Sequence, residues 1–322
     1  MSYFLVAVSN RVNLDLCLKY ATAGFTNSGN GLWTFVDINE GDFVSFMYGA
    51  RVFNLYRVKT KVAYDGAELL PPWPPVTFRP SGITYYFPYR LYLTHLRDLN
   101  EPLVRAEFAY VAENLLLRGG YRKTHFQADQ TTLQAVSEMG NLTSRIPESL
   151  DLPYAVTFQP RLTASREQSS PPRVLLFREL FLQAAVRKYL SVSDNLESFF
   201  VEAAIGQGEA DAFEVLSEKA FPEGHVDLLI KDATPKGGAR KVIAELKLGS
   251  ATTADVQQTR NYARLLGNEC LGAVLIARSH SRRVQERARE AGISLLRYET
   301  CLSDEPCTFG EIVSSLRLER SQ

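Results

Sequence analysis

The chain has 322 residues, and its 36 basic residues balance its 36 acidic ones, so its formal net charge is zero. This length predicts two domains, each large enough to bury its own core. The charge balance excludes a surface that is basic throughout, so any nucleic-acid-binding site must be local.

The composition also argues against a membrane, secreted or zinc protein. No apolar run approaches the ~20 residues of a membrane span, and the N-terminus lacks the basic flank of a signal peptide. The four cysteines include no C-X-X-C pair, and the four histidines form no H-E-X-X-H pattern. Free thiols in a reducing compartment fit best, so we expect a cytoplasmic protein.

The first part of the chain predicts short strands at close spacing. Strands are expected over residues 3–9 and 53–62, and a turn over residues 37–48 leads into another. A helix is expected over residues 14–23, followed by a loop over residues 24–31 that is rich in Gly, Asn, Ser and Thr. These elements predict an α+β domain with a small, partly open β-barrel and flanking helices.

Four motifs in this part resemble the EVE domain of the PUA superfamily, which is related to the YTH readers. They are Tyr3-Phe-Leu-Val, Ile38-Asn-Glu-Gly-Asp-Phe-Val-Ser-Phe, Pro71-Pro-Trp-Pro and Phe87-Pro-Tyr-Arg. The resemblance covers roughly residues 1–140. It implies an aromatic pocket that holds a flipped or single-stranded base, often a modified one, lined here by Asn10, Trp33, Tyr48 and Trp73.

The residue types suit that use. A base out of its stack needs aromatic faces, each worth about 1–3 kcal/mol, and an amide that reads its polar edge. Trp33 and Asn10 supply both types. The alternative is that the aromatic residues belong to the barrel core.

The stretch from Leu115 to His125 is the strongest local basic patch. Its two glycines let the backbone approach a phosphate, and Arg118, Arg122 and Lys123 would neutralise the charge. A solvated loop between helices is the plainer alternative. A polar, Pro-ended stretch over residues 161–172 then predicts a linker.

The stretch from His225 to Lys247 predicts a β-hairpin, because two runs rich in Val, Ile and Leu flank a Pro-Lys-Gly-Gly turn. Side chains alternate along a strand, so Glu245 and Lys247 share one face. If the hairpin is symmetric about Lys236, Asp227 lies opposite Glu245, at about 5 Å between Cβ atoms. Two carboxylates held this close repel unless a divalent cation neutralises them.

Oxygen ligands suit Mg²⁺, for which Mn²⁺ can substitute, and they do not suit zinc. Lys247 beside them would hold a water or stabilise charge that develops on a phosphate. An exposed edge hairpin with solvated charges is the alternative.

Helices are predicted on both sides of this hairpin. Residues 191–204 form a capped helix that carries Glu197, with Glu202 as its rival. Residues 253–266 form another helix, with Gln258 and Tyr262 four apart on one face. Gln257 is adjacent to Gln258, and a near-continuous apolar run over residues 270–277 is typical of a central strand. A basic helix that contains Arg282 and Arg283 follows, and its N-terminus is a natural phosphate site.

This order of helix, hairpin, helix and strand resembles the PD-(D/E)XK nuclease superfamily over roughly residues 173–300. The resemblance implies Mg²⁺-dependent hydrolysis of phosphodiester bonds. Asp227, Glu245 and Lys247 would match the family's Asp and acid-X-Lys, and Glu197 would match its helix acid. The metal ligands would then be Asp227, Glu245 and Glu197, with Gln258 as a further catalytic residue.

Together the two resemblances predict a base-reading domain over residues 1–160, the linker over residues 161–172, and a nuclease domain over residues 173–322. The nuclease domain is expected to be an α/β restriction-endonuclease-like fold with a central mixed sheet. The implied function is a modification-dependent DNA endonuclease of a prokaryotic cell, associated with the nucleoid when bound. Its domain arrangement separates the reader from the cutter.

The expected partner is double-stranded DNA with a methylated or hydroxymethylated base, and the alternatives are a mismatch- or damage-directed endonuclease or a non-catalytic or RNA-directed binding protein. A homodimer is expected because two strands need two active sites or two visits by one site, and a two-fold dimer presents two sites with the required symmetry. Leu175, Leu176, Phe177, Leu180 and Phe181 are predicted to lie in one helical run. They offer a candidate dimer face, and packing of most of them against their own domain is the alternative.

Overall fold

The structure is a computed structural model, which describes residues 1–49, 51–79, 81–99, 124–143, 146–152, 155–206, 209–221, 224–234, 237–302 and 305–321. The chain divides into two compact units. Unit 1 comprises residues 1–161 and 166–176, and unit 2 comprises residues 162–165 and 177–322. Within the described ranges, none of the helices has the length and apolar character that crossing a membrane requires.

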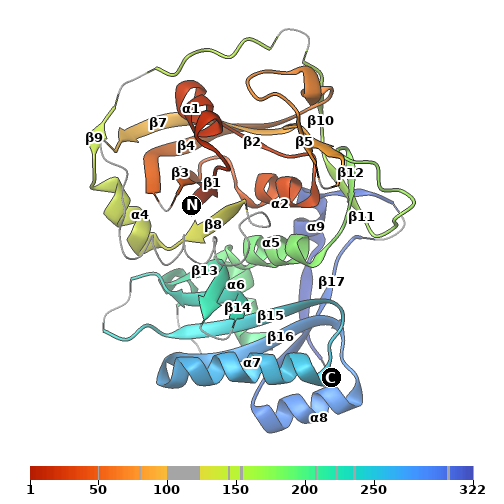
Figure 1. The fold of residues 1–322 in the computed structure, drawn as a ribbon. Helices are drawn as coiled ribbons and strands as arrows, with labels where there is room; N and C mark the ends of the chain where they lie inside the picture. Colours follow the sequence, from red (N-terminus) through yellow and green to blue (C-terminus); the bar gives the residue numbers. More distant parts are fainter. Residues whose placement is uncertain are drawn as a thin grey trace. The chain divides into compact units, whose positions relative to one another are not determined.

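Unit 1 is built on one mixed sheet (Figure 1). Its described strands follow the order β2-β7-β4-β3-β1-β8, with β9 paired to β7 and β10 to β4. β1 and β3 are parallel, and the other neighbours in this path are antiparallel. Among the described residues no pairing joins β2 to β8, so the path is open at both ends. The strands are β1 Tyr3–Ala7, β2 Thr22–Phe25, β3 Phe43–Tyr48, β4 Arg51–Tyr64, β7 Tyr89–Asp98, β8 His125–Ala128, β9 Asn141–Leu142 and β10 Thr157–Phe158, and a separate hairpin consists of β5 Val76–Phe78 and β6 Ile83–Tyr85.

The helices of unit 1 begin at capping side chains. Asn10, Ser28 and Asp129 each accept a hydrogen bond from a backbone N–H in the first turn of the helix that follows. The predicted loop over residues 24–31 is therefore wrong, because β2 continues to Phe25 and the cap at Ser28 starts a helix. The helices are α1 Arg11–Tyr20, α2 Gly29–Asp37 and α4 Gln130–Ser137, with a 3₁₀ turn η1 Ala67–Leu69.

Unit 2 contains a six-stranded mixed sheet in the order β13-β14-β15-β16-β17-β19 among its described residues (Figure 1). β13, β14 and β15 are antiparallel neighbours, β15, β16 and β17 are parallel, and β19 is antiparallel to β17. The strands are β13 Phe213–Phe221, β14 Gly224–Asp232, β15 Lys241–Ser250, β16 Cys270–Ser279, β17 Ser294–Glu299 and β19 Arg317–Arg320. The remaining short strands are β11 Arg161–Thr163, β18 Cys307–Thr308 and β12 Val174–Leu176, of which β12 belongs to unit 1.

Helices cover both faces of this sheet (Figure 1). On one face, Val256 and Tyr262 of α7 and Val284 of α8 pack with Ile243 and Leu275 of the strands. On the other face, α5 packs along β13, β14 and β15. The helices are α5 Glu179–Leu190, α6 Ser193–Glu202, α7 Thr253–Leu266, α8 Arg282–Ala291 and α9 Phe309–Ser315, with 3₁₀ turns η2 Ala210–Ala212 and η3 Gly267–Glu269.

The predicted helical run from Leu175 to Phe181 is wrong in its first half. Residues Val174–Leu176 form β12, and α5 begins only at Glu179. Phe181 is fully buried, so it belongs to the core of unit 2 and offers no exposed apolar surface.

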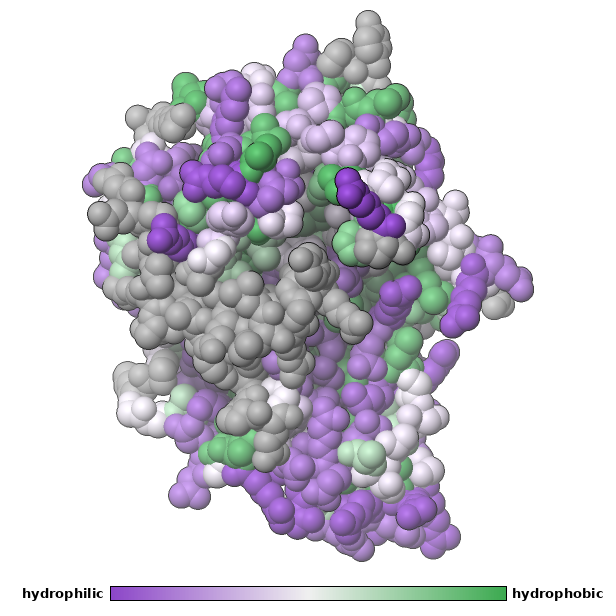
Figure 2. Space-filling model, in the orientation of Figure 1, coloured by the Kyte–Doolittle hydropathy of each residue, from purple (hydrophilic) through white to green (hydrophobic). Residues whose placement is uncertain are grey.

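The outer surface at α7 and α8 is hydrophilic (Figure 2).

Candidate active site

The hairpin register brings the predicted acids to one place. β14 and β15 pair Leu228 with Ala244 and Ile230 with Val242, which is the register that symmetry about residue 236 predicts. One step beyond the last of these pairs, Asp227 faces Glu245. Here β14 leaves β15 but remains paired with β13, so the two strands diverge at Asp227.

Asp227 occupies the point at which the two strands diverge. Its Oδ2 accepts a hydrogen bond of 2.8 Å from the backbone N–H of Leu246. Its Oδ1 accepts one of 2.5 Å from Nε2 of Gln183 on α5. A carboxylate therefore takes the place of a β14 carbonyl as the partner of Leu246, and two donors fix its orientation.

Glu245 is the more deeply buried acid, at 1% exposed. Its Oε1 has no hydrogen-bond partner among the described residues. Burial, and then the charge of Asp227, raise the pKa of Glu245 to about 9, while burial raises the pKa of Asp227 to about 6. As the site stands, the pair favours holding a proton, because two carboxylates this close repel.

Lys247 lies among carboxylates. Its Nζ is 3.8 Å from Oε2 of Glu245, 3.8 Å from Oε1 of Glu179 and 3.9 Å from Oδ1 of Asp255. Burial lowers the pKa of Lys247, but the surrounding acids outweigh burial and raise it above its ordinary value. The side chain is therefore an ammonium at neutral pH, suited to stabilising negative charge and not to abstracting a proton.

Three residues of this cluster, Glu179, Gln183 and Asp255, escaped sequence reasoning. Glu179 and Gln183 lie four apart at the start of α5, so they share one helix face and reach Lys247 and Asp227 respectively. The spacing of an acid and an amide at the start of a helix was the available signal. It was missed because apolar residues on both sides of Arg178 and Glu179 dominate this stretch.

The predicted helix acid Glu197 does not join the cluster. Its side chain is exposed on α6. Its rival Glu202 accepts a hydrogen bond of 2.9 Å from the backbone N–H of Arg320 on β19. The helix acid that reaches Lys247 is Glu179, because α5 and not α6 packs along β15.

Gln258 and Tyr262 form a hydrogen-bonded pair on α7. Nε2 of Gln258 lies 3.2 Å from the hydroxyl of the buried Tyr262, whereas Nε2 of Gln257 donates to Asn261 at 2.9 Å. The Tyr262 hydroxyl abuts Gly224 at the start of β14, where an added Cβ would lie 2.4 Å from it. This contact fixes the position of Gly224, which lies three residues before Asp227 on β14.

The chemistry of the donors suits a hard divalent cation. The candidate metal ligands are carboxylate oxygens. One of them, Oε1 of Glu245, is buried without a hydrogen-bond partner among the described residues and is available to a cation. Among the described residues no group of three or more His, Cys, Asp or Glu side chains is arranged as a metal site. Mg²⁺ typically takes one or two carboxylates and completes its shell with water and substrate phosphate, so the pair Asp227 and Glu245 fits.

In unit 1 the structure separates the predicted pocket residues. Trp33 is 2% exposed on α2, where its ring lies 4.3 Å from that of His125. Asn10 caps α1, and Tyr48 is half-buried at the end of β3. Trp33 therefore belongs to the core of the unit, which is the alternative to a place in a base pocket. Of the four predicted residues, only Trp73 lines a described cavity of this unit.

That cavity has a volume of about 150 Å³. It is largely apolar, and Trp73 and Phe87 form part of its wall with ring centroids 5.6 Å apart. Gly24 lets Trp73 approach, because a Cβ there would lie 2.4 Å from the indole. The polar residues Ser9 and Asn13 also line it.

Buried Arg90 links two of the motifs quoted from the sequence. Its guanidinium donates to the carbonyls of Leu70 and Pro71 and lies 5.5 Å from the centre of the Trp73 ring. Arg90 closes the Phe-Pro-Tyr-Arg motif, so that motif holds the Pro-Pro-Trp-Pro segment and its tryptophan against the sheet.

The predicted phosphate-binding residues divide into two groups. Arg118, Arg122 and Lys123 lie outside the described residues. Arg282 and Arg283 are exposed at the start of α8, and Arg282 pairs with Glu286 at 3.2 Å.

Comparison with known proteins gives partial likenesses. No family model and no curated protein matches the chain. A repair endonuclease from Pyrococcus abyssi is 26% identical, with 27% of this chain and 39% of that chain covered and a TM-score of 0.24. EndoMS in complex with dsDNA is 24% identical over 31% of this chain and 41% of its own, with a TM-score of 0.23. EndoMS in its apo form is 17% identical over 34% and 46%, with a TM-score of 0.22. This chain thus spans less than half the length of each.

Proposed function

We propose that unit 2 is a Mg²⁺-dependent DNA endonuclease of the PD-(D/E)XK type, with Mn²⁺ able to replace Mg²⁺. The observation that carries this proposal is the buried pair of Asp227 and Glu245 beside Lys247, where two strands diverge. A buried acid pair with raised pKa values and an adjacent ammonium is costly for folding, and such clusters are typical of functional sites.

Each residue has a separate task in this proposal. Asp227 and Glu245 would hold the cation, which supplies a Lewis acid for the phosphate and lowers the pKa of an attacking water. The Lys247 ammonium stabilises negative charge that develops on the phosphate. Gln183 and the Leu246 N–H keep the Asp227 carboxylate in one orientation.

We further propose that unit 1 holds a base flipped out of the duplex in the cavity beside Trp73. Aromatic walls from Trp73 and Phe87 suit stacking, and Asn13 and Ser9 offer polar groups for the base edge. An engineered apolar cavity of similar volume in another protein takes up benzene, so about 150 Å³ accommodates one six-membered ring. This size favours a pyrimidine, with methylated or hydroxymethylated cytosine as the preferred ligand.

In this proposal the enzyme acts on double-stranded DNA as a homodimer. Each active site attacks one phosphodiester at a time, and a two-fold dimer presents two sites to the two strands. Light scattering tests this part: a monomer that only nicks one strand contradicts the dimer.

The experiment for the whole proposal uses the full chain and matched duplexes. They carry 5-methylcytosine, 5-hydroxymethylcytosine, N6-methyladenine, a single mismatch or no change. Cleavage is followed in Mg²⁺, and binding is followed in Ca²⁺. We expect cleavage of the modified cytosine duplexes well above the plain one.

The other outcomes of this panel separate the alternatives. A preference for the mismatch favours a repair endonuclease. Binding to RNA without cleavage of any DNA favours a non-catalytic reader and contradicts the nuclease proposal.

A further inference from the structure

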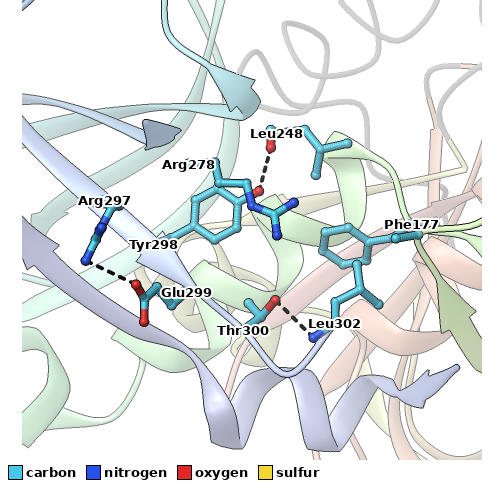
Figure 3. A pocket seen from close by; sticks show the side chains of 9 residues that line it. Phe177, Leu248, Arg278, Arg297, Tyr298, Glu299, Thr300 and Leu302 are labelled. Carbon is cyan, nitrogen blue, oxygen red and sulfur yellow. Dashed lines mark hydrogen bonds and ion pairs between the residues drawn. The ribbon is translucent and has the colours of Figure 1, made fainter. Parts of the chain in front are cut away.

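A second cavity lies in unit 2, at the carboxyl ends of its parallel strands (Figure 3). Its volume is about 560 Å³. Leu248 of β15, Arg278 of β16 and Tyr298 of β17 come from three neighbouring strands. The remaining lining residues are Ala164, Phe177, Arg297, Glu299, Thr300 and Leu302.

The wall of the cavity is fixed by one hydrogen bond. The Tyr298 hydroxyl donates to the carbonyl of Leu248 at 2.6 Å. Because β16 lies between β15 and β17, this bond ties together the ends of two strands that are not neighbours. The strand ends that form this wall of the cavity are therefore held in place by a hydrogen bond.

The two arginines of the cavity differ in their partners. Arg297 pairs with Glu299 at 3.1 Å and with Glu319 at 3.6 Å. Arg278 has no ion pair or hydrogen bond with any described residue, and its guanidinium extends over the cavity toward Phe177 (Figure 3). A charged group in this position is available to an anionic ligand.

The cavity and the acid cluster share two segments of the chain, the end of β15 and the residues at the start of α5. Leu248 directly follows Lys247, and Phe177 precedes Glu179 by two residues. Burial raises the pKa of Tyr298, the charge of Arg278 lowers it and the charge of Glu179 raises it, so both charged groups lie within electrostatic range of the Tyr298 hydroxyl. Because side chains alternate along β15, Lys247 and Leu248 point to opposite faces of the sheet, and a strand whose phosphate sits at Lys247 reaches the cavity by passing around the carboxyl end of β15.

We propose that this cavity binds one nucleotide of the cleaved strand, adjacent to the phosphodiester that is cut. Arg278 binds its phosphate, and the rings of Phe177 and Tyr298 contact its sugar and base. The proposal rests on the proposed nuclease function and adds a positioning subsite to it. Neither EVE-like base reading nor Mg²⁺ binding requires this subsite.

The test is the salt dependence of binding to a plain duplex by the full chain, in Ca²⁺ so that no cleavage occurs. Each phosphate contact contributes about 0.9 to the slope of log K against log salt. Arg278→Ala is expected to reduce the slope by about 0.9 and to weaken binding about tenfold at 0.1 M salt, while Arg278→Lys keeps the slope. Arg287→Ala is the matched control, because Arg287 is an exposed arginine of α8 that pairs with Glu290.

A second variant fills the cavity without removing a charge. Ala164→Phe is expected to raise KM for cleavage several-fold and to leave the salt slope within about 0.3 of the wild type. Thermal unfolding of each variant excludes a folding defect.

The outcomes separate this inference from the nuclease proposal. Wild-type cleavage in Mg²⁺ together with an unchanged slope and affinity in Arg278→Ala overturns the nucleotide subsite alone. Binding of free deoxynucleoside monophosphate that depends on Arg278, with no effect of Arg278→Ala on DNA binding, also overturns it and assigns the cavity to a free nucleotide. Absence of DNA binding and of cleavage in the wild type removes both.

Discussion

Oδ2 of Asp227 accepts a hydrogen bond of 2.8 Å from the backbone N–H of Leu246, across the point where β14 and β15 part. The residue on either side of Leu246 is part of the cluster, since Glu245 and Lys247 both point to the face that Asp227 approaches. One backbone donor therefore fixes the acid of one strand relative to the acid and amine of the next. The geometry of the site depends on this divergence.

Gln183→Ala removes the second donor to Asp227. A residue that orients a metal-binding carboxylate typically contributes about 10–100-fold to metal affinity or activity. We expect kcat in saturating Mg²⁺ to fall about tenfold and the Mg²⁺ requirement to rise, with KM for DNA little changed. Gln257→Ala is the matched control, because its amide bonds only Asn261 among the described residues. Equal losses in both variants would show that Gln183 has no special role.

Glu179→Ala and Glu197→Ala test which helix acid belongs to the site. Of these two acids only Glu179 reaches Lys247, so its removal is expected to lower the cleavage rate about 10–100-fold, while Glu197→Ala cleaves at the wild-type rate. Both are single carboxylates near the start of a helix, which makes them a matched pair. The reverse ranking would restore the assignment expected from the sequence.

Glu245→Gln is expected to stabilise the protein in the absence of metal. The pKa of Glu245 is raised from 4.5 to about 9 in the folded chain, so between these values the folded state binds more protons than the unfolded state. Stability therefore falls as pH rises through this window. The isosteric amide carries no charge to bury, and we expect at least ~1 kcal/mol more stability at pH 8 in EDTA, or a Tm about 2–4 °C higher.

The control is Glu319→Gln, an exposed carboxylate of the same unit. Calorimetry in EDTA at pH 5 and pH 8 measures the effect, which should shrink at the lower pH. Added Mg²⁺ should raise the Tm of the wild type and not that of Glu245→Gln, because the ligand is lost. A Glu245→Gln variant less stable than the wild type at pH 8 would show that the pKa of Glu245 is not raised in the folded chain.

Trp73→Ala and Trp33→Phe separate the reading pocket from the core. Loss of one stacking face typically weakens binding by about 1–3 kcal/mol, so Trp73→Ala should lower the affinity ratio of modified to plain DNA about 5–100-fold. Trp33→Phe should lower the Tm and leave that ratio unchanged, because Trp33 packs on His125 inside the unit. Titration of matched duplexes decides, and an unchanged ratio in Trp73→Ala would remove this cavity from base reading.

Local patterns predicted the elements that carry most of the site. A hairpin symmetric about residue 236 predicted the register of β14 and β15, and the Thr252 cap with Asp255 sets the start of α7 at the predicted Thr253. These features depend on residues close together in the chain, so the sequence contains what is needed to predict them.

Contacts between distant segments were not predictable in the same way. Gln183 and Asp227 are 44 residues apart and meet only because α5 packs along β15. In unit 1, Trp33 was predicted to line a base pocket because it follows a segment rich in glycine and asparagine. The structure places it on α2, where it and its neighbours are buried in the core. Tertiary packing decided both cases, and periodicity within one segment does not encode it.

Cleavage of duplex DNA by the wild type and by Glu245→Gln, in Mg²⁺ and in EDTA, tests the assignment of the acid cluster most directly. The wild type should cut in Mg²⁺ and not in EDTA, and Glu245→Gln, folded and more stable, should be at least about 10³-fold slower in Mg²⁺. Glu245→Gln that cuts at the wild-type rate would contradict the proposal that Asp227, Glu245 and Lys247 form the catalytic centre.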